Sequence, residues 1–166
     1  MRYDRQIILP EIGEEGQNKL QKAKVLIVGV GGLGSPIALY LAGAGVGCLG
    51  LVDDDSVSIS NLQRQVLYSE EELGKPKAVC ASQRLTSLNS EIETRHYSAR
   101  LTAENADRII QEYDIVVDGC DNFDTRYLIN DICIEQRKPY VYGAICGFEG
   151  CLLYTSDAAD DRISVD

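Results

Sequence analysis

Residues 24–53, KVLIVGVGGLGSPIALYLAGAGVGCLGLVD, contain a strand, a glycine-rich loop, a helix and a second strand. The apolar run Lys24–Val28 is typical of a strand covered on both faces of a parallel sheet. The small and apolar residues of Leu33–Ala44 predict a helix, and Gly45 is suited to end it. Cys48–Val52 predicts the second buried strand. This stretch therefore predicts the first unit of a parallel α/β sheet.

The glycine loop matches the G-x-G-x-x-G pattern through Gly29, Gly31 and Gly34, with Gly32 as a further glycine inside it. Phosphates can reach backbone amides at a helix N-terminus only where no side chain intervenes. Asp53 closes the next strand about 20 residues later, where a carboxylate can accept hydrogen bonds from ribose hydroxyls. These residues predict an adenine-nucleotide site. The alternative is a turn that serves packing alone.

Strands and helices continue to alternate along the chain, as in doubly wound folds. We expect a helix beginning at Pro76, a strand over Ile92–Tyr97, a helix from Thr102 to about Tyr113, a strand over Asp114–Asp118, a helix over Asn122–Arg137 and a strand over Tyr140–Ala144. The predicted fold is α/β: a Rossmann-like, doubly wound, mostly parallel sheet in three α/β/α layers. Residues 1–150 are predicted to form one domain.

The C-terminal residues 151–166 differ from the rest of the chain. Leu152–Thr155 could form one strand, whereas residues 156–161 are small, acidic and without periodicity. Such a composition is typical of a disordered end. The segment also resembles translated adapter sequence, so we interpret residues 151–166 as a non-native or disordered tail.

The composition limits the classes of function. A net charge of −10 argues against nucleic-acid binding, which requires local or net positive charge. No run approaches the roughly 20 apolar residues of a membrane span, and the N-terminus lacks the apolar segment of a signal peptide, so we expect a cytoplasmic protein without a membrane partner. The six cysteines form no Cys-x-x-Cys pair and are expected to be free thiols. His96, the one histidine, is expected on a strand surface rather than in catalysis.

Asn61, Arg64 and Gln65 have the i, i+3, i+4 spacing that places side chains on one face of a helical turn. Arg64 could bind phosphate oxygens with its planar guanidinium, and Asn61 could donate an amide. Lys77 could add a compact positive charge. A dehydrogenase does not need these residues. The alternative is a solvated helix face with a surface lysine, and the residues taken alone favour it.

Two acidic positions are candidates beside the phosphates. Asp121 follows a buried strand at the carboxyl edge of the sheet, where ligands of open α/β folds bind. One carboxylate together with substrate phosphates is a common way to hold Mg²⁺, although Asp121 could instead cap the next helix. Asp55 follows Asp53 and could lie near the nucleotide or a metal, or face solvent.

Five motifs occur here in an order and spacing found together in one family: Arg2–Gln6, Gly29–Gly34, Ser60–Gln65, Gly74–Lys77 and Gly119–Asn122. Over about residues 2–150 the chain thereby resembles the ThiF/MoeB/HesA family, the bacterial relatives of ubiquitin-activating enzymes. The resemblance implies an adenylyltransferase that uses ATP and Mg²⁺. Its partner would be a small β-grasp sulfur-carrier protein of a thiamine or molybdopterin type pathway, with a Gly-Gly C-terminus whose carboxylate is adenylated and pyrophosphate released.

The resemblance also implies residue roles: ribose binding by Asp53, a nucleotide pocket lined by Gly31 and its neighbours, phosphate contacts from Asn61, Arg64 and Lys77, Mg²⁺ binding by Asp121, and contact of Arg5 with the nucleotide of the other subunit of a homodimer. If the chain is monomeric, Arg5 is instead a mobile terminal charge. The alternatives for function are an NAD-dependent oxidoreductase, supported by the glycine loop and Asp53 alone, and a non-catalytic nucleotide-binding fragment.

The chain departs from the family in one respect. Family members usually continue for about another hundred residues, which carry paired Cys-x-x-Cys motifs for zinc and much of the carrier-binding surface. Cys146 and Cys151 are not such a pair, so we expect no zinc site.

Overall fold

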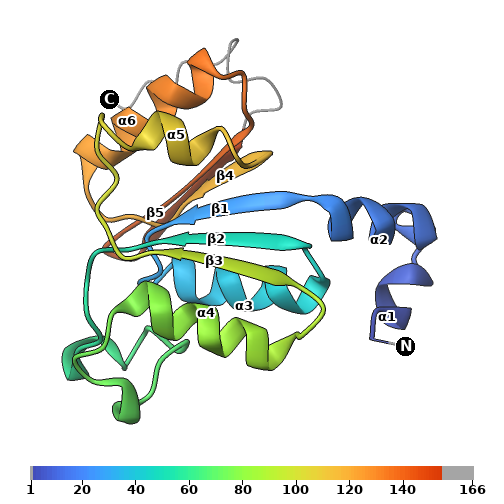
Figure 1. Ribbon diagram of the computed structural model, residues 1–166, viewed down its shortest axis with the longest axis horizontal. Coiled ribbons are helices and arrows are strands. Elements are labelled where there is room, and N and C mark those ends of the chain that lie inside the picture. The colour runs from blue at the N-terminus through green and yellow to red at the C-terminus, as the bar shows by residue number, and fades with distance from the viewer. Residues whose placement is uncertain (1, 155–166) are drawn as a thin grey trace.

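The computed structural model describes residues 2–154, which form one six-stranded sheet with helices on both faces (Figure 1). The strands are β1 Lys24–Val28, β2 Cys48–Val52, β3 Glu93–Tyr97, β4 Ile115–Asp118, β5 Tyr140–Cys146 and β6 Glu149–Tyr154. The α-helices are α1 Asp4–Ile7, α2 Gly13–Lys22, α3 Gly34–Ala44, α4 Lys77–Leu88, α5 Ala106–Ile110 and α6 Phe123–Glu135. Two short 3₁₀ turns are η1 Ile59–Asn61 and η2 Glu70–Glu72.

The strand order is β3-β2-β1-β4-β5-β6, with the first five strands parallel and β6 antiparallel to β5. Helices α3 and α4 cover one face and α5 and α6 the other, which confirms the predicted doubly wound α/β architecture (Figure 1). Each face has its own apolar core. One core contains the fully buried Leu49 and Leu51, and the other contains Leu26 and Ile110.

The predicted helix ends are mostly right. Gly45 ends α3 in the left-handed region with a φ of 84°, as its position predicted. Pro76 precedes α4 rather than opening it. The helix expected from Thr102 to Tyr113 is shorter. The regular helix begins only at Ala106, after Asn105, whose side-chain oxygen accepts the Thr102 backbone N–H at 2.9 Å.

Two N-terminal helices, α1 and α2, have no counterpart in the predicted elements. They lie at the end of the sheet opposite the loop of residues 53–76 (Figure 1). Polar side chains hold them there. Gln17, 3% exposed, donates to the carbonyl of Ala44 at 3.1 Å and accepts from Gln6 at 2.6 Å. The α1–α2 segment is thus fastened to the C-terminal end of α3.

The hairpin β5–β6 carries the sheet past residue 150, and β6 begins three residues before the strand expected at Leu152–Thr155. The domain boundary set at residue 150 and the non-native tail stay predictions, and residues 155–166 lie outside the described part of the chain. All six cysteines are free; Cys146 and Cys151 are exposed and the other four are buried. Among residues 2–154, no helix is long and apolar enough to cross a membrane.

Candidate nucleotide site

The glycine loop lies at the carboxyl end of β1 and is packed backbone against backbone. A Cβ at Gly34 would lie 1.9 Å from the carbonyl oxygen of Gly29, and one at Gly29 would lie 2.9 Å from the backbone of Cys120. Gly29 also has a φ of 82°, a conformation that glycine adopts readily. The first and third glycines of the motif are therefore required by the turn and by its contact with the Gly119–Cys120 turn after β4.

The middle glycines face side chains instead of backbone. A Cβ at Gly31 would lie 3.4 Å from the Gln65 amide nitrogen, and one at Gly32 would lie 3.5 Å from the Arg64 side chain. The structure thus brings Arg64 and Gln65 to the glycine loop, as the sequence motif predicted. A group that displaced these side chains would meet the bare backbone of Gly31 and Gly32.

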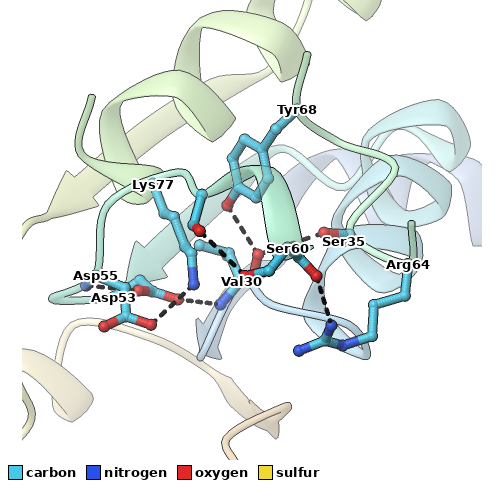
Figure 2. Close-up of polar contacts among 9 residues, drawn as sticks. Val30, Ser35, Asp53, Asp55, Ser60, Arg64, Tyr68 and Lys77 are labelled. Carbon is cyan, nitrogen blue, oxygen red and sulfur yellow. Dashed lines mark hydrogen bonds and ion pairs between the residues drawn. The ribbon is translucent and has the colours of Figure 1, made fainter. Parts of the chain in front are cut away.

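The Asn61–Gln65 tract is one helical turn rather than a longer helix. The Asn61 carbonyl accepts the backbone N–H groups of Arg64 at 3.1 Å and Gln65 at 2.9 Å. Arg64 is exposed, and its guanidinium reaches the Ser60 carbonyl only at 3.5 Å (Figure 2). Gln65 is 4% exposed, and its side-chain oxygen has no hydrogen-bond partner. The turn therefore presents one cation with a single long contact and one unsatisfied amide oxygen.

Asp53 holds the glycine loop directly. One carboxylate oxygen accepts the backbone N–H of Val30 and the other accepts that of Asp55, both at 2.9 Å (Figure 2). Burial raises the pKa of Asp53, whereas these two hydrogen bonds and the charge of Lys77 act against the rise. Tyr68 donates its hydroxyl to the Val30 carbonyl at 2.8 Å. Asp53 and Tyr68 together fix Val30 at the start of the loop.

Lys77 is not a surface residue, so the surface interpretation is wrong. Its side chain is 4% exposed, and its ammonium lies 2.8 Å from a carboxylate oxygen of Asp55, whose own side chain is 70% exposed (Figure 2). Its backbone N–H also donates to the Asp55 carbonyl at 2.9 Å. The first residue of α4 thus places a positive charge beside the Asp53–Asp55 turn.

Asp121 follows β4 in the turn that touches the glycine loop. It is exposed and makes no hydrogen bond or ion pair with any residue of the 2–154 segment. The alternative interpretation as a helix cap is wrong, because Asn122 caps α6 by accepting the Thr125 backbone N–H at 3.0 Å. The described residues contain no group of three metal-binding side chains, so Asp121 has no acidic cluster around it.

Arg5 is distant from this chain's own glycine loop. It lies exposed on α1, which is attached near Ala44 at the C-terminal end of α3. The glycine loop is at the N-terminal end of the same helix, and 11 residues at 1.5 Å each separate the two ends by about 16 Å. The structure therefore does not bring Arg5 to the other candidates. His96 is exposed on β3, as expected.

A buried polar network beneath the Asp121 turn was missed at the level of sequence. Asp118 is fully buried at the end of β4, with Arg126 and Tyr140 on one of its oxygens. One signal was available: Arg126 shares its helix face with Ile129 and Cys133, where an apolar residue is the norm. A charge at such a position indicates a buried partner.

Comparison with known proteins identifies the family of the chain. The model of the ThiF family matches residues 3–161. The chain is 53% identical over 149 residues to the sulfur carrier protein adenylyltransferase of Thermus thermophilus, covering 90% of this chain and 55% of that protein. It is also 53% identical over 151 residues to the adenylyltransferase and sulfurtransferase MOCS3 of Anopheles gambiae, covering 91% of this chain and 34% of that protein.

Among solved structures, a crystal structure of E. coli MccB with ATP superimposes with a TM-score of 0.79 and 32% identity, covering 87% of this chain and 44% of that one. The chain thus spans about half or less of the length of these relatives. The family model extends over nearly all of the described residues, including the glycine loop, the Asn61–Gln65 turn and Asp121. The chain belongs to the ThiF family.

Proposed function

We propose that this protein uses ATP to adenylate the C-terminal glycine carboxylate of a small β-grasp sulfur-carrier protein. The observation that carries the proposal is the presence of two cations near the glycine loop. Arg64 lies against Gly32, and the buried Lys77 lies beside the Asp53–Asp55 turn, whose Asp53 carboxylate holds the loop and can accept hydrogen bonds from ribose hydroxyls. Hydride transfer does not need cations there, whereas the phosphates of ATP do. The names of the relatives, as adenylyltransferases, agree with this choice.

In the proposed complex, Asp53 accepts the ribose hydroxyls and the backbone at Gly31 and Gly32 receives the phosphates. Arg64 and Asn61 donate to phosphate oxygens from the turn above the loop. Lys77 supplies a charge to the phosphates from the side of Asp55. The Arg64 guanidinium is available for this because its contact with the Ser60 carbonyl is long, at 3.5 Å.

The chemistry suits these residue types. A carboxylate oxygen of the carrier forms a bond to the α-phosphorus, the bond from that phosphorus to the oxygen bridging to the β-phosphate breaks, and pyrophosphate leaves with the electron pair. The attacking carboxylate is already ionised, so no general base is required. The barrier is charge repulsion and alignment, both of which fixed cations and hydrogen-bond donors reduce.

Asp121 is the residue we propose to hold Mg²⁺. Its carboxylate is exposed, has no partner among residues 2–154 and is located in the turn next to the glycine loop. A single carboxylate fits Mg²⁺ when nucleotide phosphates and waters complete the octahedral shell, so the lack of an acidic cluster agrees with this donor set. The ion, when bound, would neutralise charge on the phosphates.

Arg5 is proposed to act on the nucleotide of a second copy of the chain. It lies about one α3 length from its own loop, which favours a nucleotide bound by the other copy. This part of the proposal requires a homodimer. The carrier's pathway, thiamine or molybdopterin, does not follow from these residues.

The test is carrier-dependent exchange of labelled pyrophosphate into ATP, using a β-grasp carrier ending in Gly-Gly. The assay is run with this chain and with a version extended by the C-terminal part of the Thermus thermophilus relative. We expect exchange that is lost in Arg64→Ala and Asp121→Asn. Matched controls are Arg84→Ala and Asp124→Asn, exposed residues of the same types outside the site. Tight NADH binding without ATP binding would contradict the proposal and favour an oxidoreductase.

A further inference from the structure

Asp118 is a fully buried carboxylate directly below the Gly119–Asn122 turn. One of its oxygens accepts the Tyr140 hydroxyl at 2.7 Å and lies 3.3 Å from the Arg126 guanidinium. The other accepts the backbone N–H of Cys120 at 2.8 Å. The carboxylate therefore connects β4, β5 and α6 to the backbone of the turn.

Arg126 is held on several sides. One guanidinium nitrogen donates to the carbonyl of Gly143 on β5 at 2.9 Å, and another donates to the carbonyl of Cys120 in the turn. The guanidinium also lies over the ring of Tyr142, 4.5 Å from its centroid. A buried ion pair is weak evidence for added stability, because desolvation offsets its attraction. What this pair does fix is the position of the Cys120 carbonyl and amide relative to two strands.

The fixed turn is in contact with the glycine loop. A Cβ at Gly119 would lie 2.9 Å from both the Gly29 carbonyl oxygen and the Gly34 backbone nitrogen, and the Gly119 N–H donates to the Val28 carbonyl at 2.8 Å. Asp121 is two residues further on. Any shift of the turn therefore changes the distance between the Asp121 carboxylate and the loop that receives the phosphates.

We propose that Arg126, through Asp118 and Cys120, is a positioning residue that sets the place of Asp121 against the nucleotide phosphates. This inference rests on the function proposed above for Asp121. Arg126 itself touches neither nucleotide nor metal. Outer residues that orient a metal ligand typically change metal affinity by 10-fold to 100-fold when they are replaced.

The experiment measures the affinity of the full chain for ATP with and without MgCl₂, by calorimetry, in the wild type, Asp121→Asn and Arg126→Lys. Lysine keeps the charge beside Asp118 but cannot donate to two carbonyls as a planar fork. We expect both variants to lower the Mg²⁺-dependent gain in ATP affinity by about tenfold. ATP affinity without Mg²⁺ is expected to stay close to the wild-type value. Hydrogen exchange of the Cys120 amide should become faster in Arg126→Lys and stay unchanged in Asp121→Asn.

Stability is controlled with Ile129→Val, a fully buried residue of α6 one turn further along. This variant should lower the unfolding midpoint while leaving the Mg²⁺-dependent gain unchanged. If Arg126→Lys does not fold, the same measurements are made on Tyr140→Phe, which removes one hydrogen bond to Asp118 and keeps the ring. We expect a smaller loss of the same gain and faster exchange of the Cys120 amide.

The outcomes separate this inference from the proposed function. If Asp121→Asn lowers the Mg²⁺-dependent gain and Arg126→Lys does not, or if Ile129→Val lowers it equally, the positioning role is wrong and the function of Asp121 stands. If the wild type gains no ATP affinity from Mg²⁺, both are overturned. Loss of the gain in Asp121→Asn and Arg126→Lys, with Ile129→Val unaffected, supports the inference.

Discussion

Replacing Gly34 by alanine sets two physical effects against each other. Gly34 is the first residue of α3 and its φ is not positive, so helix propensity alone would favour alanine by roughly 1 kcal/mol. Its Cβ, however, would lie 1.9 Å from the carbonyl oxygen of Gly29 and 3.7 Å from a methyl group of Ile27. The obstacle at 1.9 Å is backbone, so no side-chain rotation can relieve the contact.

The magnitude follows from that distance. Cβ atoms almost never lie closer than 3.0 Å to another heavy atom, so the chain at Gly34 or Gly29 would have to move by more than about 1 Å. Overpacking in a close-packed interior costs typically about 1–3 kcal/mol, and a backbone obstacle belongs at the upper end. A net loss of about 2–3 kcal/mol corresponds to a melting temperature lower by roughly 4–12 °C for a chain of this size.

The assay is urea unfolding of Gly34→Ala beside Gly43→Ala in the same helix. A Cβ at Gly43 meets nothing within 4 Å, so alanine there should be neutral or stabilise by up to about 1 kcal/mol. Equal or greater stability of Gly34→Ala would refute the argument that backbone contact decides this position. Gly31→Ala is expected to fold normally, because its Cβ meets only the flexible end of Gln65, and to lose ATP binding.

Three further predictions concern ionisable side chains. Lys77→Met should change the unfolding free energy by less than about 1 kcal/mol, since its partner is exposed, while pyrophosphate exchange falls by about 100-fold or more. Because burial raises the pKa of Asp53, a ¹³C-detected titration of its carboxyl group should have a midpoint above 3.8. The contribution of this group to the free energy of unfolding is then lost as the pH rises through that midpoint. Bound ATP should lower the midpoint, because the ribose hydroxyls would donate to the ionised carboxylate. With a thiol reagent at pH 7, the exposed Cys146 and Cys151 should react in a fast phase that disappears when both are replaced by serine. The buried cysteines should react slowly, because burial raises the pKa of thiols such as Cys133 to about 12.

The parallel sheet could be predicted because its strands are apolar on both faces. Lys24–Val28 and Cys48–Val52 were placed at the residues where the structure has them. The α1–α2 segment could not be predicted, because its attachment depends on the buried polar residue Gln17. Burial of this side chain is possible because it forms hydrogen bonds with the carbonyl of Ala44 and the side chain of Gln6. Such contacts join positions far apart in the chain, which local periodicity does not reveal.

The site divides in the same way. The spacing of Asn61, Arg64 and Gln65 predicted a turn, and the turn does lie on the glycine loop. The Asp118–Arg126 pair was not predicted, because each charged side chain can be buried only where the other lies beside it. The burial of Lys77 was also missed, since a lysine beside Pro76 gives no local signal of its contact with Asp55, which lies 22 residues earlier.

The polar groups next to the glycine loop lack strong partners in the described part of the chain, unlike those that fasten the α1–α2 segment, and this indicates a ligand without reference to any relative. At the α1–α2 end, Gln17 and the fully buried Asn89 find partners within the chain. Buried polar groups in native proteins are normally paired. Among residues 2–154, two buried side-chain oxygens have no partner: one belongs to Gln136 at the end of α6, and the other to Gln65, whose amide nitrogen lies against Gly31. Arg64, with one long contact, lies against Gly32, and Asp121, with no contact in the described segment, follows the turn that touches Gly29. Around bare glycine backbone, Arg64 can bind phosphate oxygens, the Asp121 carboxylate, which has no partner among residues 2–154, can bind the metal ion, and the Gln65 oxygen can accept from a hydroxyl or amino group of the nucleotide. These groups therefore support ATP as the occupant.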